Sequence, residues 1–335
     1  MTAEILSTHT PALFAAAVHR AAELLRAGEV VALPTETVYG LAANALDEKA
    51  VAKIFQIKGR PANNPVIVHV AGIEMAKRCV SRWPDPAEKL ARAFWPGPLT
   101  LVLSRAPEIP GVVTASGGTV GVRWPGHPLI QAVIRSCGFP LAAPSANLSS
   151  RVSPTTAEHV HRQLGDKISL IVDGGQSHVG IESTVLDLTA SPPQVLRPGM
   201  IHAASLGAVV GNIEHQPSNA THRTLRSPGL LKKHYAPRAK LLLLGWRDDA
   251  DLRSRLATLN LRLAAGFVVA HTHIPAAKDF AGVSVIPHDV EAFARAIYAE
   301  LHRCDAASAE WIVVEAPPES PEWTGIADRL RRAAA

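Results

Sequence analysis

Basic residues stand in turn-like settings at four places along the chain, and anion binding is the chemistry they could share. Lys58 and Arg60 flank Gly59 directly before the apolar run 66–70. A polyanionic ligand such as a nucleoside triphosphate needs several convergent donors to offset its charge. Each cation alone is equally explained as a solvated loop residue, but together they favour such a ligand. The other three places are Arg123 before Trp124-Pro125, Arg197 before Pro198-Gly199, and Lys232-Lys233 after Pro228-Gly229.

Neutral polar residues follow other short apolar runs and could contact the same ligand. Ser145 and Asn147 come after the run 141–143, Ser153 opens a Ser-Pro-Thr sequence, and Ser183 precedes another apolar run. Ligands of open α/β sheets gather at the ends of strands, so these side chains are expected to donate hydrogen bonds. No G-x-S-x-G surrounds Ser145, which argues against a nucleophilic role.

The histidines give little sign of a metal site. Fifteen are present, but none has zinc-ligand spacing with a second histidine or a carboxylate. His69 differs from the others because it lies within the apolar strand expected over 66–70. On position alone it is either a satisfied core histidine or a ligand contact. The sequence therefore predicts no protein metal site.

Alternating apolar strands and amphipathic helices are expected to hold these residues in an α/β domain that ends near residue 205. A helix ends at Gly28, the strand 30–33 follows, and Asp47 caps a helix that leads into the Lys58 turn. The polar run 35–37 thus sits at the end of a strand. Further strands are expected at 99–103, 119–123, 141–143, 168–173, 184–188 and 194–196, and helices at 86–94, 128–136 and 156–164.

A second, smaller domain is expected over 239–335, after a linker at 206–238 that is rich in proline, glycine and polar residues. Its alternating pattern predicts a parallel, doubly wound, Rossmann-like sheet. No G-x-G-x-x-G occurs, so a dinucleotide site is not supported there. The expected elements are strands 240–244, 267–270, 283–287 and 311–315 and helices 249–263, 289–303 and 322–333.

Composition agrees with a two-domain globular protein. The chain has 335 residues, 47% of them apolar, and a formal net charge of +5 without a dense basic block. That excess favours anionic partners but is small for tight nucleic-acid binding. Three widely spaced cysteines suggest neither disulfides nor zinc, and residues 1–26 resemble an amphipathic helix, not a leader or a membrane span. We expect a cytoplasmic protein without membrane attachment.

Taken in order, the polar blocks resemble the YrdC-domain family over residues 12–205. Residues 227–237 and the second α/β domain are similar to the long, two-domain type of threonylcarbamoyl-AMP synthase in that family. The resemblance implies a YrdC-like twisted mixed sheet with flanking helices. The blocks that carry it are Pro34-Thr-Glu-Thr-Val-Tyr-Gly-Leu41, Lys58-Gly-Arg-Pro61, Asn64-Pro65, Trp95-Pro-Gly-Pro-Leu-Thr100, Pro144-Ser-Ala-Asn147, Ser153-Pro-Thr155, Glu182-Ser-Thr184 and Leu196-Arg-Pro-Gly199.

The resemblance also implies an activity and its site residues. L-threonine, bicarbonate and ATP would give threonylcarbamoyl-adenylate and pyrophosphate, and the product would pass to a transferase that modifies tRNA. Lys232 stands where the family usually has a tyrosine. The implied threonine-binding residues are Thr37, His69, Arg123, Ala143 and Ser183. The implied ATP-binding residues are Lys58, Arg60, Asn64, Thr119, Ser145, Asn147, Ser153, Arg197 and Lys232.

Such a reaction suits arginines and hydroxyls without a catalytic dyad. A threonine carbamate is already an anionic nucleophile, so its attack on the α-phosphate needs alignment and charge neutralisation more than a strong base. Lys58 and Arg60 are the expected catalytic residues, because they would offset the charge of departing pyrophosphate. Mg²⁺ would be held mainly through the ATP phosphates, so no protein ligand is assigned to it.

Two other functions remain open from the sequence. An RNA-binding module could use the same basic cleft without turnover and would show steep salt dependence. A carbamoyl-transfer enzyme that takes preformed carbamoyl phosphate could share the sheet, but it would not consume threonine.

The linker is expected to act as a lid over the nucleotide site, because residues 227–237 carry Lys232, Lys233 and two further polar side chains within a segment framed by proline and glycine. A passive tether is the alternative. Truncation after residue 205 separates the two. A lid predicts a folded fragment that has lost most of its activity, whereas full activity of the fragment would show that the linker is only a tether.

Overall fold

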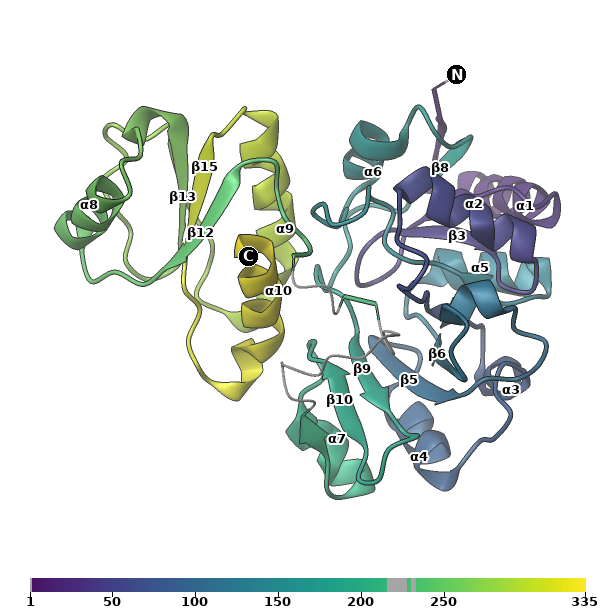
Figure 1. The fold of residues 1–335 in the computed structure, drawn as a ribbon. Helices are drawn as coiled ribbons and strands as arrows, with labels where there is room; N and C mark the ends of the chain where they lie inside the picture. The colour runs from purple at the N-terminus through teal and green to yellow at the C-terminus, as the bar shows by residue number, and fades with distance from the viewer. Residues whose placement is uncertain (1, 216–227, 230–232) are drawn as a thin grey trace. The chain divides into compact units, whose positions relative to one another are not determined.

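The computed structural model describes residues 2–215, 228–229 and 233–335 and divides the chain into two compact units (Figure 1). The first unit comprises residues 1–149 and 153–230, and the second comprises 150–152 and 231–335. The division falls within the expected linker. Part of the proposed lid, including Lys232, lies outside the described residues, so its role stays a prediction.

The first unit is built on a mixed sheet, as expected. Its strands lie in the order β1-β8-β2-β3-β7-β4-β6-β5-β9-β10-β11. The sheet contains parallel pairs such as β4 with β6 and antiparallel pairs such as β2 with β3. The strand bounds are β1 Glu4–Ser7, β2 Val31–Leu33, β3 Gly40–Asn44, β4 Val68–His69, β5 Leu99–Ser104, β6 Thr119–Arg123, β7 Leu141–Ala142, β8 Leu170–Asp173, β9 Thr184–Asp187, β10 Gln194–Arg197 and β11 Glu214–His215.

Helices cover both faces of this sheet. Helices α1 (Pro11–Arg26) and α5 (Pro128–Cys137) bury their apolar sides against one face, where Ala17, Leu25 and Val133 join a single core. The opposite face has its own core, to which the other helices contribute. Their bounds are α2 Glu48–Lys58, α3 Ile73–Arg78, α4 Asp85–Phe94, α6 Ala157–Leu164 and α7 Ala203–Val210.

Helix α2 leads into the basic turn, and local sequence determines where the helix begins and ends. The Asp47 carboxylate accepts the backbone N–H groups of Lys49 and Ala50, which satisfies donors at the helix start. Gly59 ends the helix in the left-handed conformation at φ 59°, which a residue without Cβ adopts at little cost. The chain therefore reverses between Lys58 and Arg60, as the sequence predicted.

Helix α7 belongs to the first unit and extends beyond the end near residue 205 that the sequence predicted. It spans 203–210, packs the buried Leu206 against the larger core, and is followed by β11. A truncation after residue 205 would cut through this helix. A fragment meant to contain the whole of the described first-unit fold therefore has to extend through His215.

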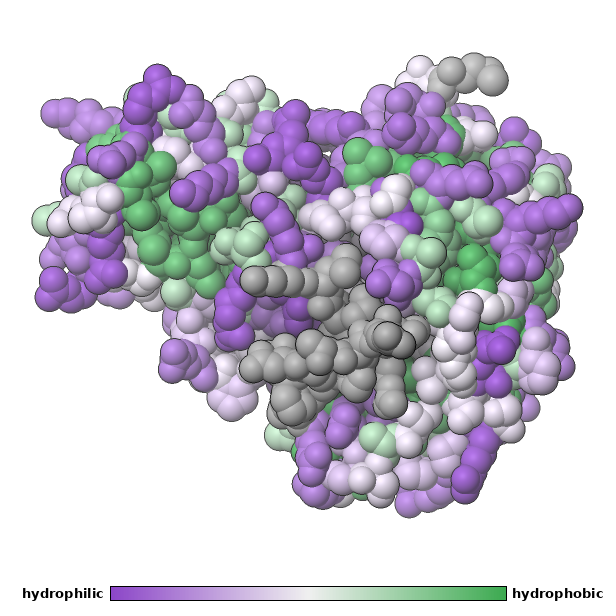
Figure 2. Space-filling model, viewed as in Figure 1, coloured by the Kyte–Doolittle hydropathy of each residue, from purple (hydrophilic) through white to green (hydrophobic). Residues whose placement is uncertain are grey.

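The second unit has an all-parallel sheet in the order β12-β15-β13-β14, which confirms the expected Rossmann-like class. Helix α8 packs on one face through Leu252 and Leu256, whereas α9 and α10 lie on the other (Figure 1). Half-buried Leu242 and Leu244 lie on the α8 face, and Figure 2 shows an apolar surface over these strands. The bounds are β12 Lys240–Leu244, α8 Asp249–Thr258, β13 Gly266–Ala270, β14 Gly282–Val285, α9 Val290–Ala306, β15 Trp311–Glu315 and α10 Thr324–Ala334.

A buried carboxylate organises the carboxyl edge of this sheet. Glu315 ends β15, and its Oε2 accepts the backbone N–H groups of His271 and Thr272 at 2.7 and 2.9 Å. Its Oε1 lies 2.7 Å from Nδ1 of His273. Burial alone would raise the pKa of Glu315, but these hydrogen bonds favour the charged form and lower the pKa to about 2.

We expect Glu315→Gln to lower the free energy of unfolding of the second unit by on the order of 2 kcal/mol, because the backbone donors after β13 lose a charged acceptor. The stabilisation by Glu315 should be complete above the ordinary glutamate pKa and lost as pH falls toward about 2. Urea unfolding at several pH values measures both effects. Exposed Glu319→Gln is the control, and equal stability of the two variants at pH 7 would contradict the expectation.

Candidate functional site

The loop after β2 is fixed by hydrogen bonds before any ligand binds. Thr35 Oγ1 accepts the backbone N–H groups of Thr37 and Val38, both at 3.2 Å. Ser177 Oγ donates to the carbonyl of Thr35, and the N–H of Val179 donates to the carbonyl of Glu36. The side chains of this loop therefore have defined positions at the end of a strand.

Arg123 is held beside this loop and is almost completely buried. Its Nε donates to the carbonyl of Gly97 at 3.2 Å and its Nη1 donates to Thr37 Oγ1 at 3.0 Å. Nη2 lies 2.7 Å from Oε1 of Glu36, which is buried as well. The guanidinium thus has a protein oxygen at each of its three nitrogens.

His69 lies directly beside Arg123, because β4 and β6 are parallel and pair these two residues in register. Burial, followed by the neighbouring Arg123 charge, lowers the pKa of His69 to about 3. The imidazole is therefore neutral at physiological pH. A neutral ring can donate or accept a hydrogen bond from a substrate hydroxyl without adding charge to the site.

Ser183 joins two parts of the site. Its Oγ lies 2.8 Å from Thr100 Oγ1 and accepts a hydrogen bond from Arg197 Nη2 at 3.1 Å. Arg197 Nε also donates to the carbonyl of Ser183, and its Nη1 donates to the carbonyl of Pro228. A residue of the implied threonine set is thus in contact with one of the implied ATP set.

Lys58 is buried, and its ammonium group donates hydrogen bonds to the protein backbone. Nζ donates to the carbonyls of Ser145 and Asn147, the former at 2.6 Å. Burial, and then the charge of Arg60, holds the pKa of Lys58 well below its ordinary value. Lys58 therefore fixes the backbone of the Ser145–Asn147 segment, a role that the sequence did not predict.

Arg60 orders the segment that follows it. Its Nε donates to the carbonyl of Asn64 at 2.9 Å, and Nη2 donates to Asn64 Oδ1 and to the carbonyl of Pro65. Ser153, fully buried, donates to Glu182 Oε1 at 2.6 Å. These contacts preorganise the side chains implied to hold ATP.

The remaining residues expected in the site differ in how close they lie to the residues described above. Ala143 is near the centre of the site, since its N–H donates to the carbonyl of Ile67 just before β4. Thr119 opens β6 opposite Ser104, at the other end of the strand from Arg123, and is half-buried. Lys232 lies outside the described residues.

Three functional neighbours were missed by sequence reasoning. They are Glu36 beside Arg123, Thr100 beside Ser183, and Glu182 beside Ser153. Each belongs to a sequence block that carried the family resemblance, and that membership was the available signal. Their partners are far away in the sequence, so the pairings themselves needed the fold.

Comparison with known proteins identifies the family of the chain. A family model described as "Telomere recombination" matches residues 23–199, and one described as "Threonylcarbamoyl-AMP synthase, C-terminal domain" matches 200–335. Threonylcarbamoyl-AMP synthase of Pyrococcus abyssi is 40% identical over 93% of this chain and 92% of its own length. The chain belongs to the threonylcarbamoyl-AMP synthase family. It is therefore an enzyme, and the expected family is confirmed.

Further relatives support the same family over both units. Threonylcarbamoyl-AMP synthase of Bacillus subtilis is 39% identical over 98% of this chain and 94% of its own length. The crystal structure of P. abyssi Sua5 complexed with L-threonine matches with a TM-score of 0.89 and 37% identity, covering 100% of this chain and 98% of that one. The family's two-domain architecture is thus present throughout the chain.

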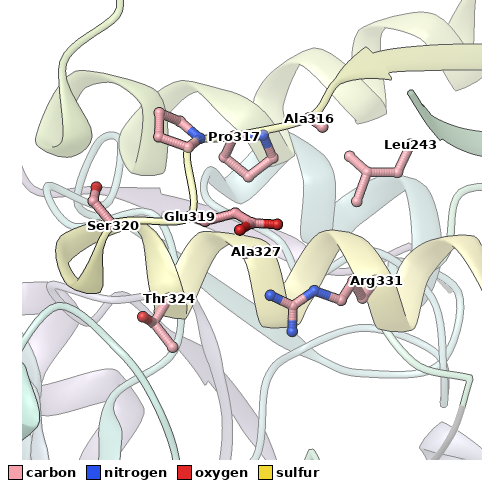
Figure 3. Close-up of a pocket in the computed structure, with 9 residues that line it drawn as sticks. Leu243, Ala316, Pro317, Glu319, Ser320, Thr324, Ala327 and Arg331 are labelled. Carbon is pink, nitrogen blue, oxygen red and sulfur yellow. The ribbon is translucent and has the colours of Figure 1, made fainter. Parts of the chain in front are cut away.

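The second unit contains a pocket of about 380 Å³ at the carboxyl ends of β12 and β15 (Figure 3). Leu243 and Pro317 give it an apolar wall, and Figure 3 shows the charged ends of Glu319 and Arg331 facing one another. Ligands of parallel α/β sheets gather at this edge. None of the described residues predicted for the threonine or ATP site lines this pocket.

The described part of the chain has no metal-binding cluster, no disulfide and no membrane-spanning helix. Within residues 2–215, 228–229 and 233–335, no group of three or more histidine, cysteine, aspartate or glutamate side chains is placed to hold a metal ion. The three cysteines are free thiols. No described helix is both long and apolar enough to cross a bilayer.

We expect the ring nitrogens of His69 to show no titration between pH 5 and 8, because burial and Arg123 lower its pKa to about 3. An ordinary exposed imidazole changes charge near pH 6.5. Nitrogen-15 NMR of selectively labelled histidine measures this directly, with His69→Gln used to assign the signal. A His69 midpoint above pH 6 would contradict the electrostatic description of this site.

Proposed function

We propose that this chain forms threonylcarbamoyl-AMP and pyrophosphate from L-threonine, bicarbonate and ATP. The contact between Arg197 Nη2 and Ser183 Oγ carries the proposal. Ser183 matches a threonine-binding position and Arg197 an ATP-binding position, so the two substrates would bind side by side. An adjacent arrangement is required if the carbamate of threonine is to attack the α-phosphate.

The amino acid would be held by Thr37, His69, Arg123, Ala143 and Ser183. Arg123 would take the carboxylate, because a guanidinium matches carboxylate geometry. Neutral His69 is suited to the side-chain hydroxyl. The relative of P. abyssi, whose structure was solved with L-threonine, supports this choice of amino acid.

Arg60 and Arg197 would neutralise the charge that develops as pyrophosphate departs. Both are buried and held by protein oxygens, so little reorganisation is needed during the reaction. Lys58 would contribute charge from behind the Ser145–Asn147 segment while it holds the backbone of that segment. Ser145, Asn147 and Ser153 would supply neutral hydrogen-bonding groups.

Mg²⁺ would accompany ATP and bind mainly through its phosphates. The donor set of the proposed nucleotide site consists of lysine, arginine, serine, threonine and asparagine, which suits phosphate oxygens better than a metal cage. When bound, the ion would supply further charge neutralisation. The product would pass to a transferase that modifies tRNA, with no tight binding of tRNA by this chain.

Release of pyrophosphate, measured with each substrate omitted in turn, tests the proposed function. We expect release only when ATP, threonine and bicarbonate are all present. Release that does not need threonine would indicate a different acceptor. Binding of RNA without any turnover would indicate an RNA-binding module instead, and its affinity should then fall steeply with salt.

We expect Arg60→Ala to reduce turnover by roughly 10²–10³-fold, the usual loss for one charged contact in a transition state. Lys58→Ala should also impair turnover, and it should lower the free energy of unfolding by about 1–3 kcal/mol because the carbonyls of Ser145 and Asn147 lose their donor. Steady-state kinetics and urea unfolding measure both variants. Near-normal turnover by both would remove this turn from the mechanism.

A further inference from the structure

Glu36 is a buried carboxylate for which the proposed mechanism has no use. It lies between Thr35 and Thr37, and its Oε1 is 2.7 Å from Arg123 Nη2. Both Glu36 oxygens are covered, and neither they nor Nη2 makes an aligned hydrogen bond within the described part of the chain. The contact is therefore an ion pair of two buried charges. A covered carboxylate makes no contact with a substrate in this arrangement, and Arg123 is the ion-pair partner through which it would act on one.

Burying a guanidinium and a carboxylate together lowers stability, because both charges lose their hydration. A buried pair of this kind therefore suggests a functional role. Arg123 already has neutral acceptors at Gly97 and Thr37. Glu36 adds the negative charge that these acceptors lack. In its absence the pocket wall would carry one uncompensated positive charge, close to neutral His69.

That charge balance matters for the choice of ligand. An amino acid is a zwitterion, so a carboxylate that binds Arg123 brings an ammonium group close behind it. An uncompensated guanidinium attracts any carboxylate or phosphate, and its field disfavours the ammonium group. A charge-balanced pair still donates hydrogen bonds to a carboxylate but no longer penalises the ammonium. Substrates of this enzyme include two competing anions, bicarbonate and ATP, which makes such a balance useful.

We propose that Glu36 is a positioning and specificity residue: through Arg123 it tunes the pocket for a zwitterionic amino acid over simple anions. The inference rests on the proposed function, because it assigns Arg123 to the carboxylate of threonine. Glu36 holds the Nη2 end of the guanidinium in place and offsets its charge. The backbone of Glu36 is fixed by the N–H of Val179, which donates to its carbonyl at 2.7 Å.

Glu36→Gln tests the proposal, because it removes the charge and keeps the shape of the side chain. We expect KM for threonine to rise by at least about tenfold, as for loss of one partner of a buried pair, with KM for ATP within about twofold. The second readout is inhibition by 3-hydroxybutyrate, which is threonine without its ammonium group. The preference for threonine over this analogue should shrink in the variant.

Glu29→Gln is the matched control, since Glu29 pairs with Lys53 at the surface and loses the same charge. Glu36→Asp keeps the charge on a shorter side chain and should retain the preference for threonine with a moderately raised KM. It also serves if Glu36→Gln fails to fold, which thermal unfolding would reveal. Retention of the preference by Glu36→Asp in that case supports the proposal, and its loss overturns it.

An unchanged threonine KM in folded Glu36→Gln would overturn the proposal. A raised KM with an unchanged preference over 3-hydroxybutyrate would overturn its specificity part, because Glu36 would then only support the fold of the pocket. The wild-type enzyme separates these results from failure of the proposed function. If the wild type shows no threonine-dependent pyrophosphate release, the function is wrong; if it does and Glu36→Gln matches it, only this inference is wrong.

Discussion

Four lysine and arginine side chains are buried in the described part of the first unit, and the need to give each of them acceptors shapes the loops around the site. Lys58, Arg60, Arg123 and Arg197 all donate to backbone carbonyls, and three of them also meet a polar side chain. A buried cation without such partners would lower stability by several kcal/mol. The acceptors are loop segments, so the same bonds that satisfy the cations fix the segments that face the substrates.

For the proposed reaction, this arrangement would remove the need for a separate catalytic base. A reaction between two anions requires that charge be neutralised in place, and water that had to reorient would do this less well than fixed donors. The desolvation of these cations is offset by hydrogen bonds that form when the protein folds, before either substrate binds. In such a site the rate enhancement comes from the alignment of the substrates. Residues that hold the binding residues in place are then as necessary as the residues that contact a substrate.

Local sequence was enough to predict the elements whose signal is strong. Strands 240–244 and 311–315 were predicted with their observed bounds, because each contains a continuous apolar run, as is typical of strands in a parallel sheet. Strand β3 was missed, since Gly40 and its alanine neighbours have little strand propensity and depend on pairing with β2 and β7. Helix α7 was missed for a similar reason, because its short apolar pattern is interrupted by Gly207.

For the site, the sequence could predict residues that lie in motifs but not the contacts between them. The resemblance pointed to Arg123 and Ser183, and in the structure Arg123 donates to Thr37 and Ser183 accepts from Arg197. The resemblance did not show that Lys58 donates hydrogen bonds to two backbone carbonyls, nor that Glu36 forms an ion pair with Arg123. Those facts depend on contacts between segments distant in sequence, and a carboxylate between two threonines gives no local sign of burial.

The link between the two subsites is the central claim, and calorimetry can test it. Threonine affinity should be measured with and without a non-hydrolysable ATP analogue, in the wild type and in Ser183→Ala. Because Arg197 reaches the threonine side through the Ser183 hydroxyl, we expect the analogue to tighten threonine binding several-fold in the wild type and to lose this effect in the variant. Equal threonine affinity in the wild type with and without the analogue would contradict the claim that the subsites are joined.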